Sequence, residues 1–237
     1  MLRRQLLAEA FGTFSLVFAG TGAIVIDAVT GGQIGHLGVA ITFGLVVLAM
    51  IDSLGDISGC HINPAVTLGF WAARRFPGRL VGPTIAAQSL GAVVASGTLR
   101  LLFPNSPTLG ETLPAGPVLQ SVVLEIILSF MLMVVILRVA EGAKEKGLLA
   151  GLSIGAVITL EAAFAGPISG ASMNPARSLG PALVAGRPEH LWIYVIAPVI
   201  GAMAAVPLAS ALHPERRSED AMPAQEIGPS PADASSD

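Results

Sequence analysis

The chain has 237 residues, of which 53% are hydrophobic and only 12% charged, and its mean hydropathy is +0.73. Soluble domains carry roughly 25% charged residues, so the composition excludes an ordinary soluble protein and predicts a protein embedded in a lipid bilayer. The formal net charge of −3, without a contiguous basic patch, indicates no nucleic-acid partner, and the single Cys60 excludes an intrachain disulfide.

Six stretches are apolar enough to cross a bilayer, which requires about 20 apolar residues. They are 6–26, 37–54, 81–103, 118–137, 148–164 and 191–212. Continuous runs of Leu, Val, Ile and Ala favour helices over the alternating pattern of a membrane barrel. We therefore predict an all-α integral membrane fold. Stretch 6–26 lacks the pattern of a signal peptide, so we expect it to remain in the mature protein.

A second feature is a short motif that occurs twice, 111 residues apart, at Asn63, Pro64, Ala65 and at Asn174, Pro175, Ala176. Asn is a favoured helix N-cap, and Pro suits the first helical position because its missing N–H is not needed there. The apolar stretches that follow, 65–71 and 176–184, are too short to span a bilayer. We predict two half-helices, preceded by irregular backbone over 55–62 and 166–173 that lines a watery cavity.

The motif divides the chain into two similar parts, 1–112 and 113–212, each with three spans and one half-helix. Because three is odd, the second part must enter the membrane from the opposite side, which gives an inverted repeat whose half-helices meet near the midplane. The polar tail 213–237 is expected to be disordered and cytoplasmic.

The distribution of basic residues predicts the orientation. If the N-terminus is cytoplasmic, Arg100 and Arg187 lie outside, and Arg177 lies in the second half-helix. Ten others lie inside, namely Arg3, Arg4, Arg74, Arg75, Arg79, Arg138, Lys144, Lys146, Arg216 and Arg217. We expect both termini in the cytoplasm, and the short loops suggest the inner (plasma) membrane of a prokaryote.

Two facing half-helices can form a pore that selects against charge. The amides of Asn63 and Asn174 offer donors to a passing oxygen, and each helix N-terminus contributes about half an elementary positive charge, which repels cations including hydronium. Glu9 and Glu125 occupy matching places in the two parts. We expect them to anchor the re-entrant loops by accepting backbone N–H groups; the alternative is a proton relay.

The doubled Asn-Pro-Ala motif, with Arg177 after the second copy, resembles the major intrinsic protein family, the aquaporins and aquaglyceroporins. The resemblance runs from Glu9 to about Leu212. It implies a homotetramer with one pore per subunit. The run 165–181 and Tyr194-Val195 look most like the nodulin-26-like branch and its bacterial relatives, which pass water, glycerol, urea or uncharged metalloid hydroxides.

The resemblance also implies a selectivity filter made of Phe43, Ala162, Ala171 and Arg177. Water-selective members typically have His where Ala162 stands, so the two alanines imply a wider, less polar filter. Ser178 and Ala182 instead resemble water channels. We therefore expect a passive channel for water and small uncharged solutes, with a strictly water-selective pore and, less favoured, a secondary transporter as alternatives.

Several other polar residues have two interpretations. Glu161 either anchors a loop or tunes Arg177, and Asp56 is either a solvated acid or a gating contact for Arg74 and Arg75. Cys60 and His61 are adjacent and lack metal-ligand spacing, so no metal site is expected. No nucleophile and base pair or phosphate loop is present, which argues against an enzyme, and no cofactor is expected.

Overall fold

The computed structural model describes residues 1–140 and 149–212. Lys144 and Lys146 of the predicted basic face, and the whole tail 213–237, lie outside these residues. The helices are α1 (Leu2–Val29), α2 (Gly35–Ser58), α3 (Pro64–Ala72), α4 (Gly78–Leu102), α5 (Val118–Val139), α7 (Ala150–Ser169), α8 (Pro175–Ala185) and α9 (Leu191–Ala211). Strands are absent from the described residues, and the predicted all-α fold is confirmed.

Six of the helices in the described part of the chain, all except α3 and α8, are long and apolar enough to cross a membrane. They correspond one to one to the six predicted spans. Large apolar side chains such as Leu7, Phe11, Leu37, Ile41 and Leu45 are exposed on the outer surface of these helices. An apolar outer surface is what a bilayer requires of a multi-pass membrane protein.

The two re-entrant loops are shorter than predicted, because α2 and α7 continue helically to Ser58 and Ser169. The expected irregular backbone at 55–58 and 166–169 is therefore wrong. Each helix ends at a glycine with left-handed backbone, Gly59 and Gly170, both at φ 84°. Glycine adopts this conformation without steric cost and is a common helix C-cap. The boundary prediction followed apolarity, whereas the backbone hydrogen-bond ladder continues until that glycine.

The two short helices begin as the sequence predicts. The side-chain oxygen of Asn63 accepts from the backbone N–H groups of Ala65 and Val66 at the start of α3. The oxygen of Asn174 accepts from those of Ala176 and Arg177 at the start of α8. In both helices proline occupies the first turn, where no intrahelical N–H donor is required.

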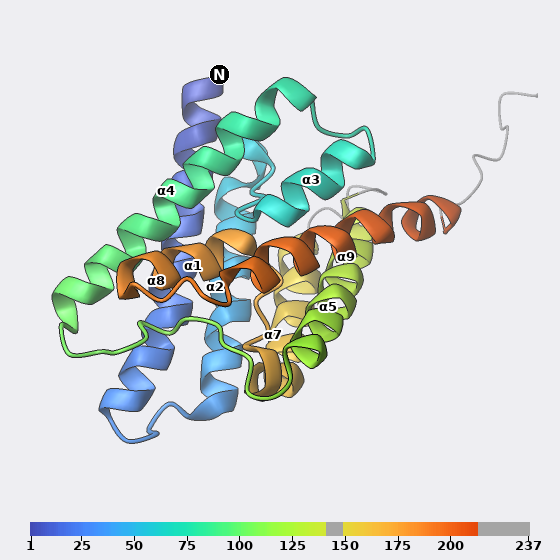
Figure 1. Cartoon of the computed structure of the whole chain (residues 1–237). Coiled ribbons are helices and arrows are strands. Elements are labelled where there is room, and N and C mark those ends of the chain that lie inside the picture. The colour runs from blue at the N-terminus through green and yellow to red at the C-terminus, as the bar shows by residue number, and fades with distance from the viewer. Residues whose placement is uncertain (141–148, 213–237) are drawn as a thin grey trace, which may run out of the picture.

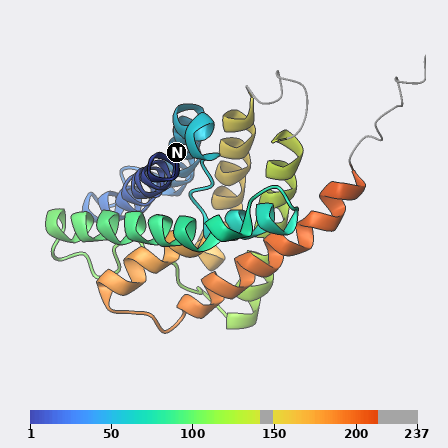
Figure 2. The ribbon, with the colours of Figure 1, turned by 90° about the horizontal axis from the view of Figure 1, so that it is seen from above.

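The chain arranges its helices in two similar groups, with α1 packed against α4 and α5 against α9 (Figure 1). Each pair approaches closely at a glycine: Gly91 lies on the carbonyl of Ala10, and Gly201 on the carbonyl of Ile126. The half-helices cross between the groups, since α3 packs against α9 and α8 against α4 (Figures 1 and 2).

Two opposite faces of the molecule carry different segments of the chain (Figure 1). The N-terminal face holds the first turn of α1. The loop face holds the connections 30–34, 103–117 and 186–190, and loop 103–117 runs across that face from α4 to α5.

Candidate functional site

The two motif asparagines bridge the re-entrant loops at the centre of the molecule. The amide nitrogen of Asn63 donates to the carbonyl of Met173 at 2.8 Å, and that of Asn174 donates to the carbonyl of Ile62 at 2.9 Å. A primary amide has two N–H donors, so each asparagine retains one for another acceptor. The half-helix N-termini are thereby fixed beside each other, with their positive dipole ends meeting at the asparagines.

Two cavities meet at these asparagines. The one toward the N-terminal face has a volume of about 630 Å³, and the one toward the loop face about 30 Å³. Both are lined by Leu16, Asn63, Leu132, Ile158 and Asn174. The asparagines therefore separate a broad vestibule from a narrow constriction. A volume of roughly 30 Å³ is the share that one water molecule takes in the liquid.

The four residues of the expected filter lie together around this constriction. Phe43 comes from α2, Ala162 from α7, Ala171 from the second re-entrant loop and Arg177 from α8. The Arg177 guanidinium carbon lies 5.1 Å from the centre of the Phe43 ring, and its Nη1 donates to the carbonyl of Gly110 at 2.9 Å. Arg177 is 3% exposed. The two alanines contribute only methyl groups to the constriction, whereas Phe43 and Arg177 contribute a ring and a guanidinium that contact each other.

Glu9 is completely engaged by the first re-entrant loop. Its carboxylate accepts hydrogen bonds from the backbone N–H groups of His61 and Ile62, at 2.9 and 2.7 Å, and from the hydroxyl of Ser58 at 2.7 Å. Gln88 of α4 donates to the same carboxylate at 2.8 Å. Sequence reasoning missed Gln88; a lone amide within an apolar span was the available signal.

Glu125 makes the equivalent contacts with the second loop. It accepts from the backbone N–H groups of Ser172 and Met173 and from the hydroxyl of Ser169, each at 2.8 Å. Both Glu9 and Glu125 are buried, and each has several charge-assisted hydrogen bonds.

The same strained backbone recurs in both loops. Cys60 and Ile62 have φ values of 47° and 43°, and Ala171 and Met173 have 41° and 53°. Residues other than glycine rarely adopt this left-handed region, so neighbouring contacts must hold them there. The glutamate hydrogen bonds provide such contacts. The resulting twist turns the carbonyls of Ile62 and Met173 toward the opposite asparagine.

Glu161 does not make the contacts expected of a loop anchor. Its side chain is fully buried, yet neither carboxylate oxygen has a hydrogen-bond partner within residues 1–140 and 149–212. The loop anchor expected at Glu161 is therefore wrong, and no ion pair with Arg177 is found in that part of the chain. The anchor was expected because Glu161 directly precedes Ala162 on a helix, and helical neighbours differ by about 100° in direction, so that both are not expected to face the pore.

Three of the remaining polar residues line the large cavity. Asp56 and Cys60 line the large cavity. His61 also lines it, with its Nδ1 3.1 Å from the Thr67 hydroxyl and its ring stacked on Phe70 at 4.7 Å. On the opposite side, the Nε2 of His36 lies 2.8 Å from the carbonyl of Ala163.

Gly110 was also missed by the sequence analysis, although its carbonyl contacts Arg177. Leu109 and Gly110 both have positive φ, 51° and 72°, which brings this turn against Thr21 of α1. The Thr112 hydroxyl then donates to Ser178 at 2.7 Å. Polar pairs between a loop and a distant half-helix leave no spacing pattern in a single sequence.

Comparisons with known proteins agree with this geometry. Residues 1–208 match the sequence profile described as "Major intrinsic protein". The chain is 53% identical over 202 residues to "Aquaporin NIP1-1" of Oryza sativa subsp. japonica, covering 85% of this chain and 71% of that protein. It is 48% identical to "Nodulin-26" of Glycine max, covering 85% and 74%. The aquaglyceroporin structure from Plasmodium falciparum superposes with a TM-score of 0.80 at 24% identity, covering 89% of this chain and 100% of that one.

Proposed function

Because this chain belongs to the major intrinsic protein family, we propose that it is a passive membrane channel for water and small uncharged solutes such as glycerol, urea and metalloid hydroxides. One observation carries the proposal: two asparagine-capped half-helices meet end to end between a vestibule and a constriction. The relatives named "Aquaporin NIP1-1", at 53% identity, and "Nodulin-26", at 48% identity, support the same function.

The geometry explains how such a pore passes neutral molecules and rejects ions. A solute oxygen reaching the centre accepts from the free amide N–H of Asn63 or Asn174, in place of hydrogen bonds to water. The two helix N-termini place positive potential at the same point, and Arg177 adds a full charge at the constriction. A cation is repelled both by the helix N-termini and by Arg177. A neutral solute loses only hydrogen bonds to water, and the asparagine amides replace some of these.

A strictly water-selective pore is the second candidate, and the constriction volume of about 30 Å³ favours it. Ala162 and Ala171 favour the broader pore, because their side chains are single methyl groups that leave space beside Phe43 and Arg177. A secondary transporter is less favoured: among the described residues, Arg177 is the charged group that lines the constriction.

The test is stopped-flow light scattering on proteoliposomes. Osmotic shrinkage reports water flow, and swelling in isotonic gradients of glycerol, urea and boric acid reports solute flow. Fast entry of both supports the broad pore. Fast water flow with all three solutes excluded selects the water-selective alternative, and solute flux that saturates and follows a proton gradient would indicate a transporter.

The anchoring roles of Glu9 and Glu125 belong to the same proposal. Their hydrogen bonds to residues 61–62 and 172–173 hold the loops in the strained conformation that presents the asparagines. The two parts 1–112 and 113–212 then act as inverted repeats, each supplying one half-helix.

We also propose a homotetramer in the plasma membrane with both termini cytoplasmic, which would make the loop face external. An apolar surface groove of about 600 Å³ between α5 and α7, which includes Leu119, Val123 and Phe164, is a place where a second subunit would replace lipid. Native mass spectrometry tests the oligomer, and accessibility of a cysteine introduced at Ser106 in a Cys60→Ser background tests the orientation.

A further inference from the structure

Loop 103–117 reaches the half-helix α8 through three consecutive residues. The Gly110 carbonyl accepts from Arg177 at 2.9 Å, Glu111 pairs with Arg187 at 3.2 Å, and the Thr112 hydroxyl donates to Ser178 at 2.7 Å. Arg177 and Ser178 lie in the first turn of α8, whereas Arg187 directly follows its C-cap, Gly186. The loop is thus tied to both ends of the helix that carries the filter arginine.

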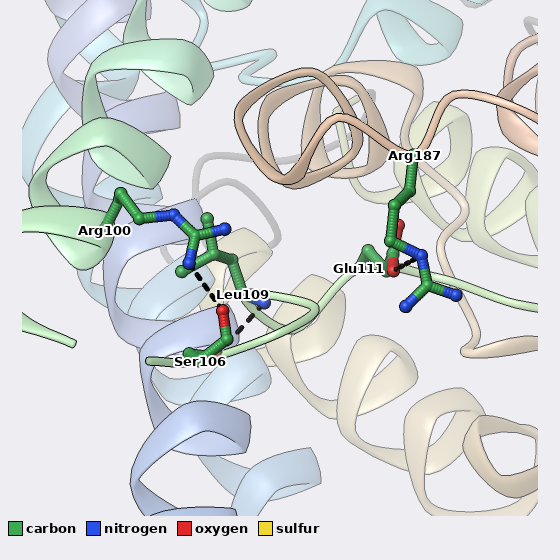
Figure 3. A network of polar contacts seen from close by, with 5 residues as sticks. All are labelled: Arg100, Ser106, Leu109, Glu111 and Arg187. Carbon is green, nitrogen blue, oxygen red and sulfur yellow. Dashed lines mark hydrogen bonds and ion pairs between the residues drawn. The ribbon is translucent and has the colours of Figure 1, made fainter. Parts of the chain in front are cut away.

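The Glu111 and Arg187 ion pair differs from an ordinary surface pair. The two side chains point toward each other (Figure 3). The Arg187 side chain is 44% exposed, but that of Glu111 is only 1% exposed. Neither oxygen of Glu111 has a hydrogen-bond partner in the described part of the chain. Arg187 is therefore the main compensation for a carboxylate that is otherwise buried, and a buried charge is strongly destabilised when its partner is removed.

The first part of the loop, residues 104–109, is held by contacts other than the ion pair. Arg100 of α4 donates to the carbonyls of Pro104 and Ser106, at 3.1 and 2.6 Å, and the Ser106 hydroxyl accepts from the N–H of Leu109 at 3.3 Å (Figure 3). Gly110 lies between this part of the loop and Glu111. Its carbonyl position depends on both supports, so a change at Glu111 reaches Arg177 through a single peptide unit.

We propose that the Glu111 and Arg187 ion pair is a positioning element of the filter, which holds the Gly110 carbonyl against Arg177 and thereby sets the ratio of solute to water permeability. The inference rests on the proposed channel function. Glu111 does not touch the permeating molecule. It acts through Gly110, because the carbonyl fixes the guanidinium that closes the constriction against Phe43.

The pair also makes the filter sensitive to pH. Burial raises the pKa of the Glu111 carboxyl above its ordinary value, Arg187 and His190 oppose this rise, and Glu189 adds to it. Tyr194 of α9 is the other titratable group that interacts with Glu111. As pH falls through the raised pKa, Glu111 takes up a proton and loses its attraction to Arg187. The ion pair between Glu111 and Arg187 is thus present at neutral pH and lost in acid.

The experiment compares the wild type with Glu111→Gln and Arg187→Gln in proteoliposomes, measuring the ratio of glycerol to water permeability. Each substitution is expected to raise the ratio about threefold at neutral pH, a change that corresponds to about 0.7 kcal/mol. The double variant should show no further change. Glu189→Gln removes the same charge from the same face and should leave the ratio unchanged.

The pH profile separates positioning from general destabilisation. The pH is lowered equally inside and outside the proteoliposomes, from neutral to about 4, which is close to the ordinary pKa of glutamate. Over this range the wild-type ratio should rise toward that of Glu111→Gln. The Glu111→Gln ratio should stay flat over the same range. In Arg187→Gln the carboxyl should protonate at higher pH than in the wild type. A wild-type ratio that does not change with pH, or an equal effect of Glu189→Gln, would overturn the proposal.

Amide hydrogen exchange gives a readout that does not depend on transport. The amides of residues 106–112 should exchange faster in Glu111→Gln, while those of α8 near Asn174 stay protected. If the wild type passes water and glycerol no faster than protein-free liposomes do, the proposed channel function is wrong. Amide hydrogen exchange then still tests whether the Glu111 and Arg187 ion pair fixes loop 103–117. If the wild type is an active channel and Glu111→Gln exchanges its amides at the wild-type rate, the positioning role of the ion pair is wrong and the channel function stands.

Discussion

The Arg177 guanidinium carbon lies 5.1 Å from the centre of the Phe43 ring. At this distance the positive charge is attracted to the aromatic face, an interaction of about 0.5–2 kcal/mol that is stronger where water is excluded. The contact links α8 to α2 across the constriction. We therefore predict that selectivity depends on the position of one ring and one guanidinium, beside two alanines that set the remaining space.

Replacing Ala162 with His should convert the pore to strict water selectivity. The added ring narrows the constriction beside Phe43 and Arg177, so larger solutes lose their path while water can exchange hydrogen bonds with the imidazole. We expect glycerol and boric acid permeability to fall at least about tenfold, which corresponds to about 1.4 kcal/mol. Stopped-flow swelling measures it. Ala162→Ser adds polarity with little volume; an equally large loss there would show that size is not the cause.

Asn174→Asp should let cations through. The substitution keeps the helix cap, since a carboxylate oxygen also accepts the N–H groups of Ala176 and Arg177. It removes the amide donor to Ile62 and places a negative charge where two helix ends otherwise create positive potential. Proton or sodium flux into liposomes should rise above the wild-type background by about tenfold or more. Intact ion exclusion in a water-permeable variant would argue against the dipole barrier.

Glu125→Gln and Glu161→Gln form a matched pair. Both side chains are fully buried, but Glu125 accepts three hydrogen bonds and Glu161 none within the residues that the structure covers. An amide at 125 turns an N–H toward backbone N–H groups, at a cost of about 3 kcal/mol. At 161 the change should be within about 1 kcal/mol, with unaltered selectivity. Thermal unfolding in detergent compares them; equal melting temperatures would contradict the anchoring role.

Gly91→Ala should destabilise the packing of α1 on α4. A Cβ at Gly91 meets the carbonyl carbon of Ala10 and the backbone nitrogen of Phe14, both at 3.0 Å, so the helices must separate. We expect a loss of about 1–3 kcal/mol, as for other overpacked sites. Gly97 lies in the same helix, and a Cβ there meets nothing within 4 Å. Gly97→Ala should be neutral or slightly stabilising in the same melting assay.

The sequence predicts the helical layout well because long apolar runs and capping motifs are local signals. The six spans and the starts of α3 and α8 are confirmed. The ends of α2 and α7 were placed too early, because a helix stops where its backbone conformation changes at Gly59 and Gly170, which apolarity does not report.

The constriction was harder to predict. Its narrowness comes from Phe43 and Arg177 meeting across helices, and the position of Arg177 depends on a carbonyl from a loop 67 residues away in sequence. Any residue type supplies a backbone carbonyl, so Gly110 had no chemical signature. Glu161 shows the converse: its type resembles that of Glu9 and Glu125, and only its surroundings reveal that it makes none of their contacts.

The crossing of the two half-helices constrains how the protein can be assembled. Because α3 packs on α9, the first half-helix meets its main support only when the last span has been synthesised. During translation α3 is synthesised before α9, so it cannot yet pack against that helix, whereas α4 has already been synthesised when α8 emerges. The biogenesis of the pore is therefore asymmetric in time, although its finished halves are alike.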